Sequence, residues 1–428
     1  MNNSRHPSCF IASFSNLLQK RELQIDDDLL FGLSSSFDFQ YNYANLPLSG
    51  PTHTFTGTNF NAFSNLASKL NMEYKIEFSS KELILDKLSE TIKQYSIVIV
   101  EVSIKALLAY YSDQQLDSLM SMITEGESNH VINVVDICDS YVHVYDNFHE
   151  GIQKLNKEIL VNAMFPVEKA ILTARGRIHC FQFAAEYSEP AFTDYMSSIY
   201  HSSYRFLYGN NPNTGLRALH QFRINFPIMI ENSQENDKQR SVQLFYYFCI
   251  SAGGGSFFRK HYLRFLKKIA EKYEITDELA IIIAKYKTLH NKWRSFAITV
   301  QKSANSSEHN TETLLGMLDE IIHMEESGNH ALLSFSLTHK KETQFLKFIN
   351  HASSTLDIKS ITSYLNLIGY EYQYKATNEK TDIDADFEHY GHCIYVLEKK
   401  KSELVHYHPA LITDSKDQQR YDYFIIFN

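Results

Sequence analysis

An imidazole and a carboxylate at opposite ends of one short stretch could form the acid–base part of a nucleophilic active site. The stretch runs from His130 to Asp146, HVINVVDICDSYVHVYD, and its Val, Ile and Tyr content indicates two short strands joined by a polar turn at 138–140. If the hairpin is centred on Cys138, residues whose numbers sum to 276 oppose each other, with Cβ atoms roughly 4.5–5.5 Å apart. The pattern therefore predicts that His130 and Asp146 meet, so that the carboxylate orients the imidazole and stabilises its protonated form.

Cys9 offers the nucleophile that such a pair lacks. Apolar residues recur at helical spacing from Phe10 to Leu18, and Pro7 suits a first turn, where its missing N–H is harmless. Cys9 would then lie in the first turn of a buried helix, whose unsatisfied N–H groups and dipole favour a thiolate. The alternative is that Cys9 is simply a small buried apolar side chain.

Several predicted elements lie between these residues. Amphipathic patterns predict helices over 59–70, 80–95 and 106–124, and the apolar run at 97–102 predicts a buried strand. The segment 29–41, LLFGLSSSFDFQY, is loop-like, and we expect its aromatic side chains to line a cleft or to fill a core. A helix led by Cys, then a strand, then a hairpin with His and an acid is the chain order of a papain-like cysteine enzyme.

The composition limits the class of protein. A chain of 428 residues with 44 % hydrophobic content can bury more than one core, which favours two or three domains. The net charge of -9 argues against a nucleic-acid partner, and no apolar run approaches the roughly 20 residues of a membrane span. The start lacks the apolar core of a signal peptide, and the five cysteines form an odd set without C-x-x-C spacing. We therefore expect a soluble cytoplasmic protein with no nucleic-acid or membrane partner.

Residues 1–185 resemble the N-terminal domain of the butirosin-biosynthesis acyltransferase family, which is papain-like. The matching pieces, in order, are HPSCFIAS, LLFGLSSSFDFQY, IVIVEV followed by LLAYY, and the hairpin that carries His130 and Asp146. The resemblance implies that Cys9 is the nucleophile, His130 the base and Asp146 the acid. Short motifs carry it, so its specificity comes from their joint order.

The resemblance extends over roughly residues 1–340, because 253–270 and 286–297 resemble the helical domain that follows in this family. Two departures concern the expected substrate cleft. Serines occupy 34–36, where the family is rich in glycine, and Ser103 stands where the family often has Asp.

A basic helix is predicted after the glycine turn 253–255. Its cationic residues are Arg259, Lys260, Arg264, Lys267 and Lys268. In an acidic chain such a surface is typical either of a solvated helix face or of a site that docks an acidic partner; the resemblance implies an acyl carrier protein. The glycine turn could also bind an anion at the helix start, although no P-loop pattern with its lysine is present.

The remaining residues, 345–428, lie outside the resemblance. They include a predicted helix at 358–369 and a stretch, 392–410, that aligns without gaps to 130–148. This stretch is either a diverged repeat of the first hairpin that has lost its acid or an unrelated hairpin with an exposed lysine turn at 399–401. A metal site is a further interpretation of this region, because it contains His389, His392, Cys393, His406 and His408. No standard zinc spacing appears among them, so we expect no metal and no cofactor.

These observations predict an α+β chain with three domains: a papain-like catalytic domain over 1–185, a mainly helical domain over 186–344 and a small mixed α/β region over 345–428. The resemblance implies a cysteine acyltransferase of natural-product biosynthesis. It would move an acyl group from the phosphopantetheine thioester of an acyl carrier protein to an amine, forming an amide. The alternatives are a cysteine hydrolase with water as acceptor and a non-catalytic papain-like binding protein.

The roles of the site residues follow from this chemistry. Cys9 would carry the acyl group, His130 would move the proton and Asp146 would orient His130. The backbone N–H of Cys9 is the expected oxyanion donor, with His6 as a second donor. The aromatic loop would exclude water from the site. The expected substrate-binding residues are His6, Phe31, Phe37, Phe39 and Tyr41, and the expected partner-binding residues are Arg259, Lys260, Arg264 and Lys267.

Overall fold

The chain forms two compact units, Met1–Ser334 and Phe335–Asn428. The computed structural model describes residues 4, 6–46, 50–59, 61–108, 129–166, 176–183, 187–231, 235–304, 311–339, 393–400, 403–409 and 423–427.

A six-stranded antiparallel sheet organises the first part of unit one. Its strands are β3 (Met72–Phe78), β4 (Val98–Ser103), β5 (Asn129–Ile137), β6 (Tyr141–Tyr145), β7 (Gln153–Asn156) and β8 (Arg177–Phe183), in the order β3-β8-β4-β5-β6-β7. The helices beside it are α1 (Cys9–Lys20), α2 (Asp27–Leu33), α3 (Ala62–Lys69), α4 (Ile84–Tyr95), α5 (Ile104–Leu108) and α7 (Lys157–Met164). The predicted helices at 59–70 and 80–95 and the predicted strand at 97–102 are thus confirmed. Of the helix predicted at 106–124, only the start, in α5, lies within the described residues.

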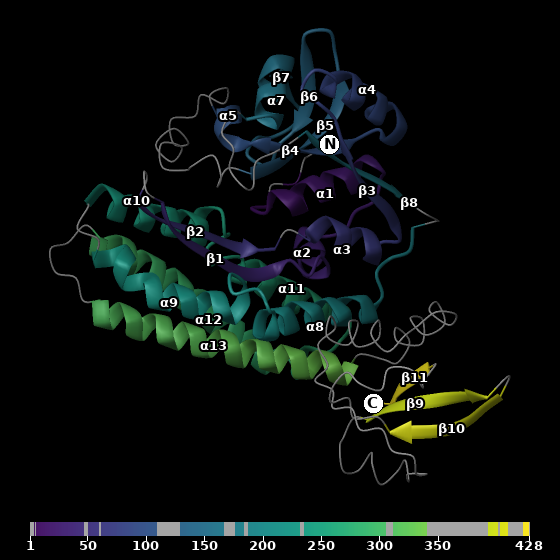
Figure 1. Cartoon of the computed structure of the whole chain (residues 1–428), viewed down its shortest axis with the longest axis vertical. Coiled ribbons are helices and arrows are strands. Elements are labelled where there is room, and N and C mark those ends of the chain that lie inside the picture. The colour runs from purple at the N-terminus through teal and green to yellow at the C-terminus, as the bar shows by residue number, and fades with distance from the viewer. Residues whose placement is uncertain are drawn as a thin grey trace. The chain divides into compact units, whose positions relative to one another are not determined.

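The sheet has a helical layer on each side. Alternate apolar side chains of β4, β5 and β6, such as Val100, Ile132 and Val144, pack with α4, α5 and α7 into one core. Helix α1 lies against β5 and β4, across the strands from α4 and α7 (Figure 1). The helix that begins with Cys9 is therefore held directly under the strand that carries His130.

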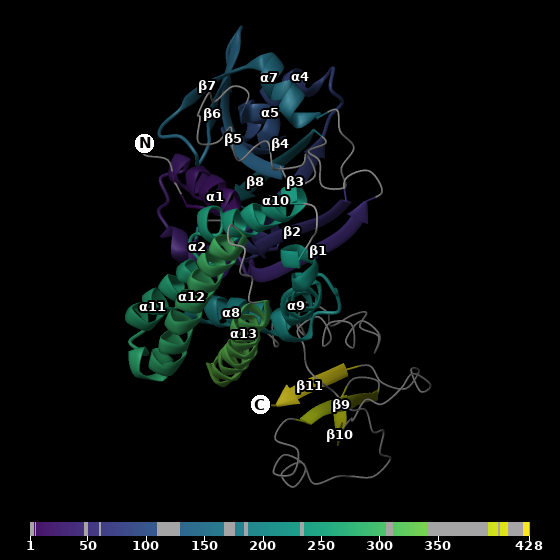
Figure 2. The ribbon, with the colours of Figure 1, turned by 90° about the vertical axis from the view of Figure 1, so that its left-hand side faces the viewer.

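A two-stranded hairpin, β1 (Phe37–Leu46) and β2 (Gly50–Thr58), joins this part to the helical part of the same unit. The helical elements are α8 (Phe192–Tyr208), α9 (Gly215–Glu231), α10 (Glu235–Tyr246), the π-helical turn η2 (Tyr247–Ser251), α11 (Arg259–Lys272), α12 (Thr276–Ala304) and α13 (Thr311–His339). The hairpin packs on α8, α9 and α10, and Figure 2 shows it between the six-stranded sheet and helices α8 and α9. The α+β class and the helical second part are confirmed, while the papain-like fold and the domain boundaries stay predictions.

The segment 29–41 is not a loop. It contains the last five residues of α2 and the start of β1. Phe37, Phe39 and Tyr41 alternate along β1. The distance between ring centroids is 4.1 Å from Phe37 to Tyr262 and 5.6 Å from Phe39 to Trp293. For Tyr41 and Phe222 it is 5.3 Å. Each is at most 1 % exposed.

These three rings, and the equally buried Phe31, therefore fill a core and do not cover a cleft. The prediction that they bind substrate is wrong, because an amphipathic strand can present its aromatic face to a second layer of helices as readily as to a ligand. The other interpretation of the same pattern, that these rings fill a core, is the one that the structure has.

Unit two contains a three-stranded antiparallel sheet. Its strands are β9 (Cys393–Lys400), β10 (Glu403–Pro409) and β11 (Tyr423–Phe427), in the order β10-β9-β11. The hairpin predicted at 392–410 is present as β9 and β10. The predicted helix at 358–369, His389 and His392 lie outside the described residues.

Candidate active site

Cys9 is the first residue of α1 and is partly exposed. Ser8 precedes it as an N-cap in an extended conformation, and no acidic residue lies in the first helical turn. First-turn N–H groups have no intrahelical acceptor, and the positive end of the helix dipole lies at the same place. Both features stabilise a negative charge on the sulfur of Cys9.

Buried amides fasten α1 to β5. Asn16 Nδ2 donates to Asn133 Oδ1 at 3.2 Å, and Asn133 Nδ2 donates to the carbonyl of Ser13 at 2.9 Å. The Ser13 hydroxyl donates in turn to the carbonyl of Val131, the residue after His130. Because buried polar groups are costly when unpaired, these bonds specify one position of the helix along the strand. They hold Cys9 and His130 in a fixed relation.

His130 and Asp146 are in contact. His130 Nε2 lies 3.0 Å from Asp146 Oδ1, and both side chains are buried. The same carboxylate oxygen accepts the backbone N–H of Phe148 at 3.0 Å, and the Phe148 ring packs against the imidazole. The Asp146 bond occupies Nε2, which leaves Nδ1 of His130 for Cys9.

The contact forms in a register different from the one predicted. The turn is at 138–140, as expected, but Asn133 pairs with Tyr145, and the register shifts again between Val134 and Asp136. Asp146 follows the end of β6 and is diagonal to His130, not directly opposite it. The offset is two residues, so both side chains keep the same face of the pleat, and diagonal neighbours remain within reach of long side chains. The hairpin is not centred on Cys138: its turn lies over Asp139 and Ser140, which offsets the pairing by three residues, and the bulge between Val134 and Asp136 reduces this offset to two.

The electrostatics of the cluster favour a protonated His130 beside an ionised Asp146. Burial alone would lower the pKa of His130, but the charges of Asp146 and Cys9 and their hydrogen bonds to the ring raise it to about 10. Burial likewise works against ionisation of Asp146, yet the charge of His130 lowers the pKa of that carboxyl. The imidazole therefore stays protonated at neutral pH, next to the Asp146 carboxylate and hydrogen-bonded to Cys9.

Tyr247 in η2 borders the same site, and the sequence analysis missed it. Burial, and then the negative charge of Cys9, raise the pKa of Tyr247 to about 12. Its hydroxyl thus keeps its proton next to the sulfur. Residues 247–251 form a π-helical turn, a feature often found at functional sites, but no periodicity in the sequence marks a single inserted turn.

A comparison with known protein families matches residues 8–147 to the family described as "Butirosin biosynthesis protein H, N-terminal". That range contains Cys9, His130 and Asp146. The N-terminal part of the chain thus matches the family that the sequence resemblance predicted. Residues 167–332 match a second family, a domain of unknown function (DUF4872), which covers most of the helical part. No curated protein matches the chain.

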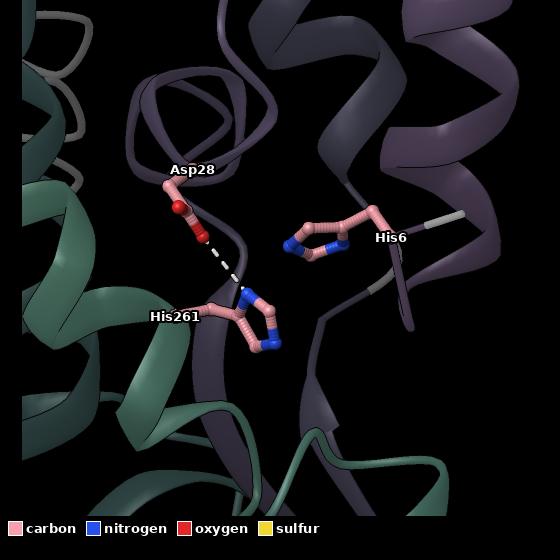
Figure 3. Close-up of side chains that lie close together, drawn as sticks. All are labelled: His6, Asp28 and His261. Carbon is pink, nitrogen blue, oxygen red and sulfur yellow. Dashed lines mark hydrogen bonds and ion pairs between the residues drawn. The ribbon is translucent and has the colours of Figure 1, made fainter. Parts of the chain in front are cut away.

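Two residues before the matched range, His6 supports the start of α1 from the side. Its Nδ1 accepts the backbone N–H of Ser8 at 3.1 Å, and its carbonyl accepts from Asn147 Nδ2 at 3.0 Å. The ring points toward Asp28 and His261 (Figure 3) and lies 4.4 Å from the His261 ring. Burial, followed by the charge of His261, lowers the pKa of His6 to about 3. We therefore replace the expected oxyanion-donor role of His6 by a positioning role: it ties the residues before Cys9 to the residue after Asp146.

The residues expected to bind a partner separate into two kinds. Arg259 is fully buried, and it donates to Glu325 at 2.6 Å and to the carbonyl of Asp38 at 3.0 Å. Its prediction as a docking residue is wrong, because the buried ion pair joins α11 to α13 and β1. Lys260 is partly exposed, and Arg264 and Lys267 are exposed, so these three stay candidates for docking.

Two clusters bring together side chains that ligate metals. His6, Asp28 and His261 offer atoms within 4.8 Å of one another, as do Asp136, Cys138 and His143. In the first cluster, Nδ1 of His6 accepts a hydrogen bond, so its proton is on Nε2 and blocks that nitrogen as a ligand. Asp28 is already bound to His261 and Lys268. The first cluster therefore fits a hydrogen-bonded network better than a metal centre.

The second cluster is another Cys/His/Asp combination, on the same hairpin as His130. Cys138 Sγ lies 3.5 Å from Asp136 Oδ2 and 3.8 Å from His143 Nδ1, and His143 Nδ1 lies 3.2 Å from Asp136 Oδ2. Asp136 is exposed, and the other two are partly exposed. Loss of hydration, and then the hydrogen bond to Asp136, raise the pKa of the Cys138 thiol. This environment disfavours a thiolate.

The described residues contain no helix long and apolar enough to cross a lipid bilayer.

Proposed function

We propose that this chain is a cysteine acyltransferase of natural-product biosynthesis that moves an acyl group from a carrier-protein thioester to an amine. The observation that carries the proposal is the Cys9–His130–Asp146 arrangement, in which a helix-terminal thiol shares one imidazole with a buried carboxylate. The family name, which refers to butirosin biosynthesis, supports a biosynthetic role. A papain-like catalytic domain is part of the same proposal.

In the first step, the Cys9 thiolate attacks the thioester carbonyl. A new carbon–sulfur bond forms, and the carbonyl oxygen takes the negative charge. The free N–H at the start of α1 is placed to stabilise that oxyanion. The tetrahedral intermediate then expels the carrier thiolate, which takes its proton from the His130 imidazolium. The products are acyl-Cys9, neutral His130 and the free carrier thiol.

In the second step, an amine attacks the acyl-Cys9 carbonyl. Neutral His130 accepts the proton that the nitrogen loses, and Asp146 stabilises the imidazolium that results. Collapse of the intermediate releases the amide and regenerates the thiolate–imidazolium pair. A cysteine hydrolase would follow the same steps with water in place of the amine.

The carrier protein is proposed to dock on the exposed basic residues of α11. Lys260, Arg264 and Lys267 remain candidates for that surface, while the buried Arg259 is excluded. Carrier proteins are acidic, so opposite charges would accelerate the encounter and make it sensitive to salt.

The test is intact-mass measurement of the full chain after incubation with a panel of acyl thioesters. We expect a mass gain of one acyl group, located on the Cys9 peptide after digestion. Addition of an amine acceptor should discharge it as an amide faster than water discharges it as an acid. Discharge that is equally fast without any amine would favour the hydrolase. If no thioester in the panel acylates Cys9, the proposal fails.

A further inference from the structure

A cationic depression lies beside the glycine turn that precedes α11. It encloses about 370 Å³, a volume within the range of small-ligand sites, and five basic or imidazole side chains line it: Lys260, His261, Arg264, His290 and Arg294. They come from α11 and α12, which pack against each other.

The positive charges of this depression have no counter-charge. In the part of the chain that the structure describes, no carboxylate lies within ion-pair distance of Lys260, Arg264 or Arg294. Lys268 on α11 and Lys292 on α12 are, in contrast, paired with Asp28 and Glu320. Unpaired cations that converge on one concave surface favour an anionic ligand.

The surroundings of the two histidines in the depression also show an excess of positive charge. Burial, and then the charges of Lys260 and Arg294, lower the pKa of His290. His261 Nδ1 donates to Asp28, whose pKa is held at about 2 by His261 and Lys268 against the opposing effect of burial. The Asp28 carboxylate is thus engaged by these two residues, and the second nitrogen of His261 stays unoccupied by it (Figure 3).

The backbone is shaped to bring these groups together. Gly254 has φ +61°, and a Cβ there would lie 2.5 Å from the His261 ring, so only glycine allows this close approach. Ser256 Oγ accepts the N–H of Lys260 and lies 2.7 Å from His290 Nδ1. Ser256 therefore has its hydroxyl proton available for Nδ1, which leaves His290 Nε2 as a donor.

The depression is close to the candidate nucleophile in two ways. Gly254 packs on Pro7, since a Cβ at Gly254 would lie 3.2 Å from Pro7 Cγ, and Pro7 is two residues before Cys9. Ile250 also lines the depression. It lies in the same π-helical turn as Tyr247, whose pKa is raised by burial and then by its electrostatic interaction with Cys9.

We infer that this depression binds the phosphate of a 4′-phosphopantetheine thioester and so positions the thioester for Cys9. The inference rests on the proposed function for the identity of the thioester. The unpaired Lys260, Arg264 and Arg294 supply the chemistry for the phosphate, because guanidinium groups form charge-assisted, bidentate hydrogen bonds with phosphate oxygens.

The test compares the binding of 4′-phosphopantetheine with that of pantetheine, which lacks only the phosphate, by titration calorimetry on the full-length Cys9→Ala chain. We expect 4′-phosphopantetheine to bind at least about tenfold more tightly, with a preference that declines as salt rises. The further double substitution Arg264→Gln/Arg294→Gln should abolish the preference. Lys287→Gln removes an exposed charge of α12 outside the depression and should preserve it.

Equal binding of the two compounds overturns the inference, and so does an equal loss of preference in Lys287→Gln. Thermal unfolding of each variant shows whether the fold is retained, and Lys260→Gln supplies a second variant. Binding of coenzyme A distinguishes whether the phosphopantetheine arm comes from free coenzyme A or from a carrier protein. If it binds as tightly as 4′-phosphopantetheine, free coenzyme A thioesters are donors; if it binds at least about tenfold more weakly, the arm is carried on a protein. Both results support the phosphate site.

Acylation of wild-type Cys9 by a phosphate-free pantetheine thioester is measured separately. Acylation together with equal binding of the two pantetheine compounds would leave the proposed function in place and overturn the phosphate site. Phosphate-dependent binding without acylation by any thioester would support the depression as an anion site and overturn the proposed function.

Discussion

Two Cys/His/Asp clusters occur near the same hairpin, and they differ in which group lies next to the sulfur. In the first, His130 lies between Cys9 and the buried Asp146. In the second, the carboxylate of Asp136 contacts both Cys138 and His143 near the exposed turn. The residue types are the same, so composition alone does not distinguish the two clusters.

The order of the charges and their burial make the difference. Loss of hydration, and then the neighbouring Asp136 carboxylate, raise the pKa of Cys138 and oppose its ionisation. In the first cluster, the imidazolium lies between Cys9 and Asp146, so the group next to the sulfur is positively charged, and the start of α1 adds its own positive potential. Cysteine reactivity therefore depends on which group lies next to the sulfur, and three experiments test this contrast.

Replacement of each cysteine by alanine, one at a time, should produce the largest difference between the two clusters. Cys9→Ala should abolish formation of the acyl-enzyme, because no other group would form the thioester, while Cys138→Ala should leave it within about twofold of wild type. Intact mass after incubation with an acyl thioester gives the readout, with circular dichroism as the control for folding. Full acylation of the Cys9→Ala chain would invert the comparison.

Removal of the orienting charge should have the next largest effect. Asp146→Asn is expected to slow acyl transfer by roughly 10²–10⁴-fold, because His130 would lose both its tautomer and its stabilising charge. The matched substitution Asp136→Asn, at the exposed cluster, should change the rate by less than about twofold. Steady-state rates for both variants provide the measurement, and similar losses in the two would refute the assignment.

The smallest of the three effects is expected in the free energy of unfolding. Its dependence on pH should differ between a variant of His130 and a variant of His143. The pKa of His130 is about 10 in the folded chain against 6.5 for an ordinary histidine. Its protonation therefore stabilises the fold fully below pH 6.5, and this contribution is lost as pH rises through 10. Denaturant unfolding should show that His130→Gln costs more free energy at pH 6 than at pH 10.

The control for this measurement is His143→Gln in the exposed cluster. As a surface substitution, it should change the free energy of unfolding by at most about 0.5 kcal/mol at either pH. A cost of His130→Gln that is independent of pH, or that grows toward pH 10, would contradict a charged His130 in the folded chain.

Local pattern by itself determined much of the first part of this protein. Helical spacing after Cys9, the apolar run at 97–102 and the turn at 138–140 predict α1, β4 and the hairpin, because these features depend on neighbours in the sequence. The contact between His130 and Asp146 was also predicted, but the even offset that keeps both side chains on one face depends on the bulge in β5, which the sequence analysis did not predict.

Only the tertiary structure decided which apolar and charged side chains meet. Phe37, Phe39 and Arg259 have the residue types of a binding surface, yet they lie in the core where β1 packs on the helical layer. The neighbours of Cys9 in η2 and the cationic depression join segments more than 200 residues apart in sequence, such as Pro7 and Gly254. Periodicity reports which face of an element is apolar, but not which distant element covers that face, and so burial, charge pairing and pocket formation are settled only by packing.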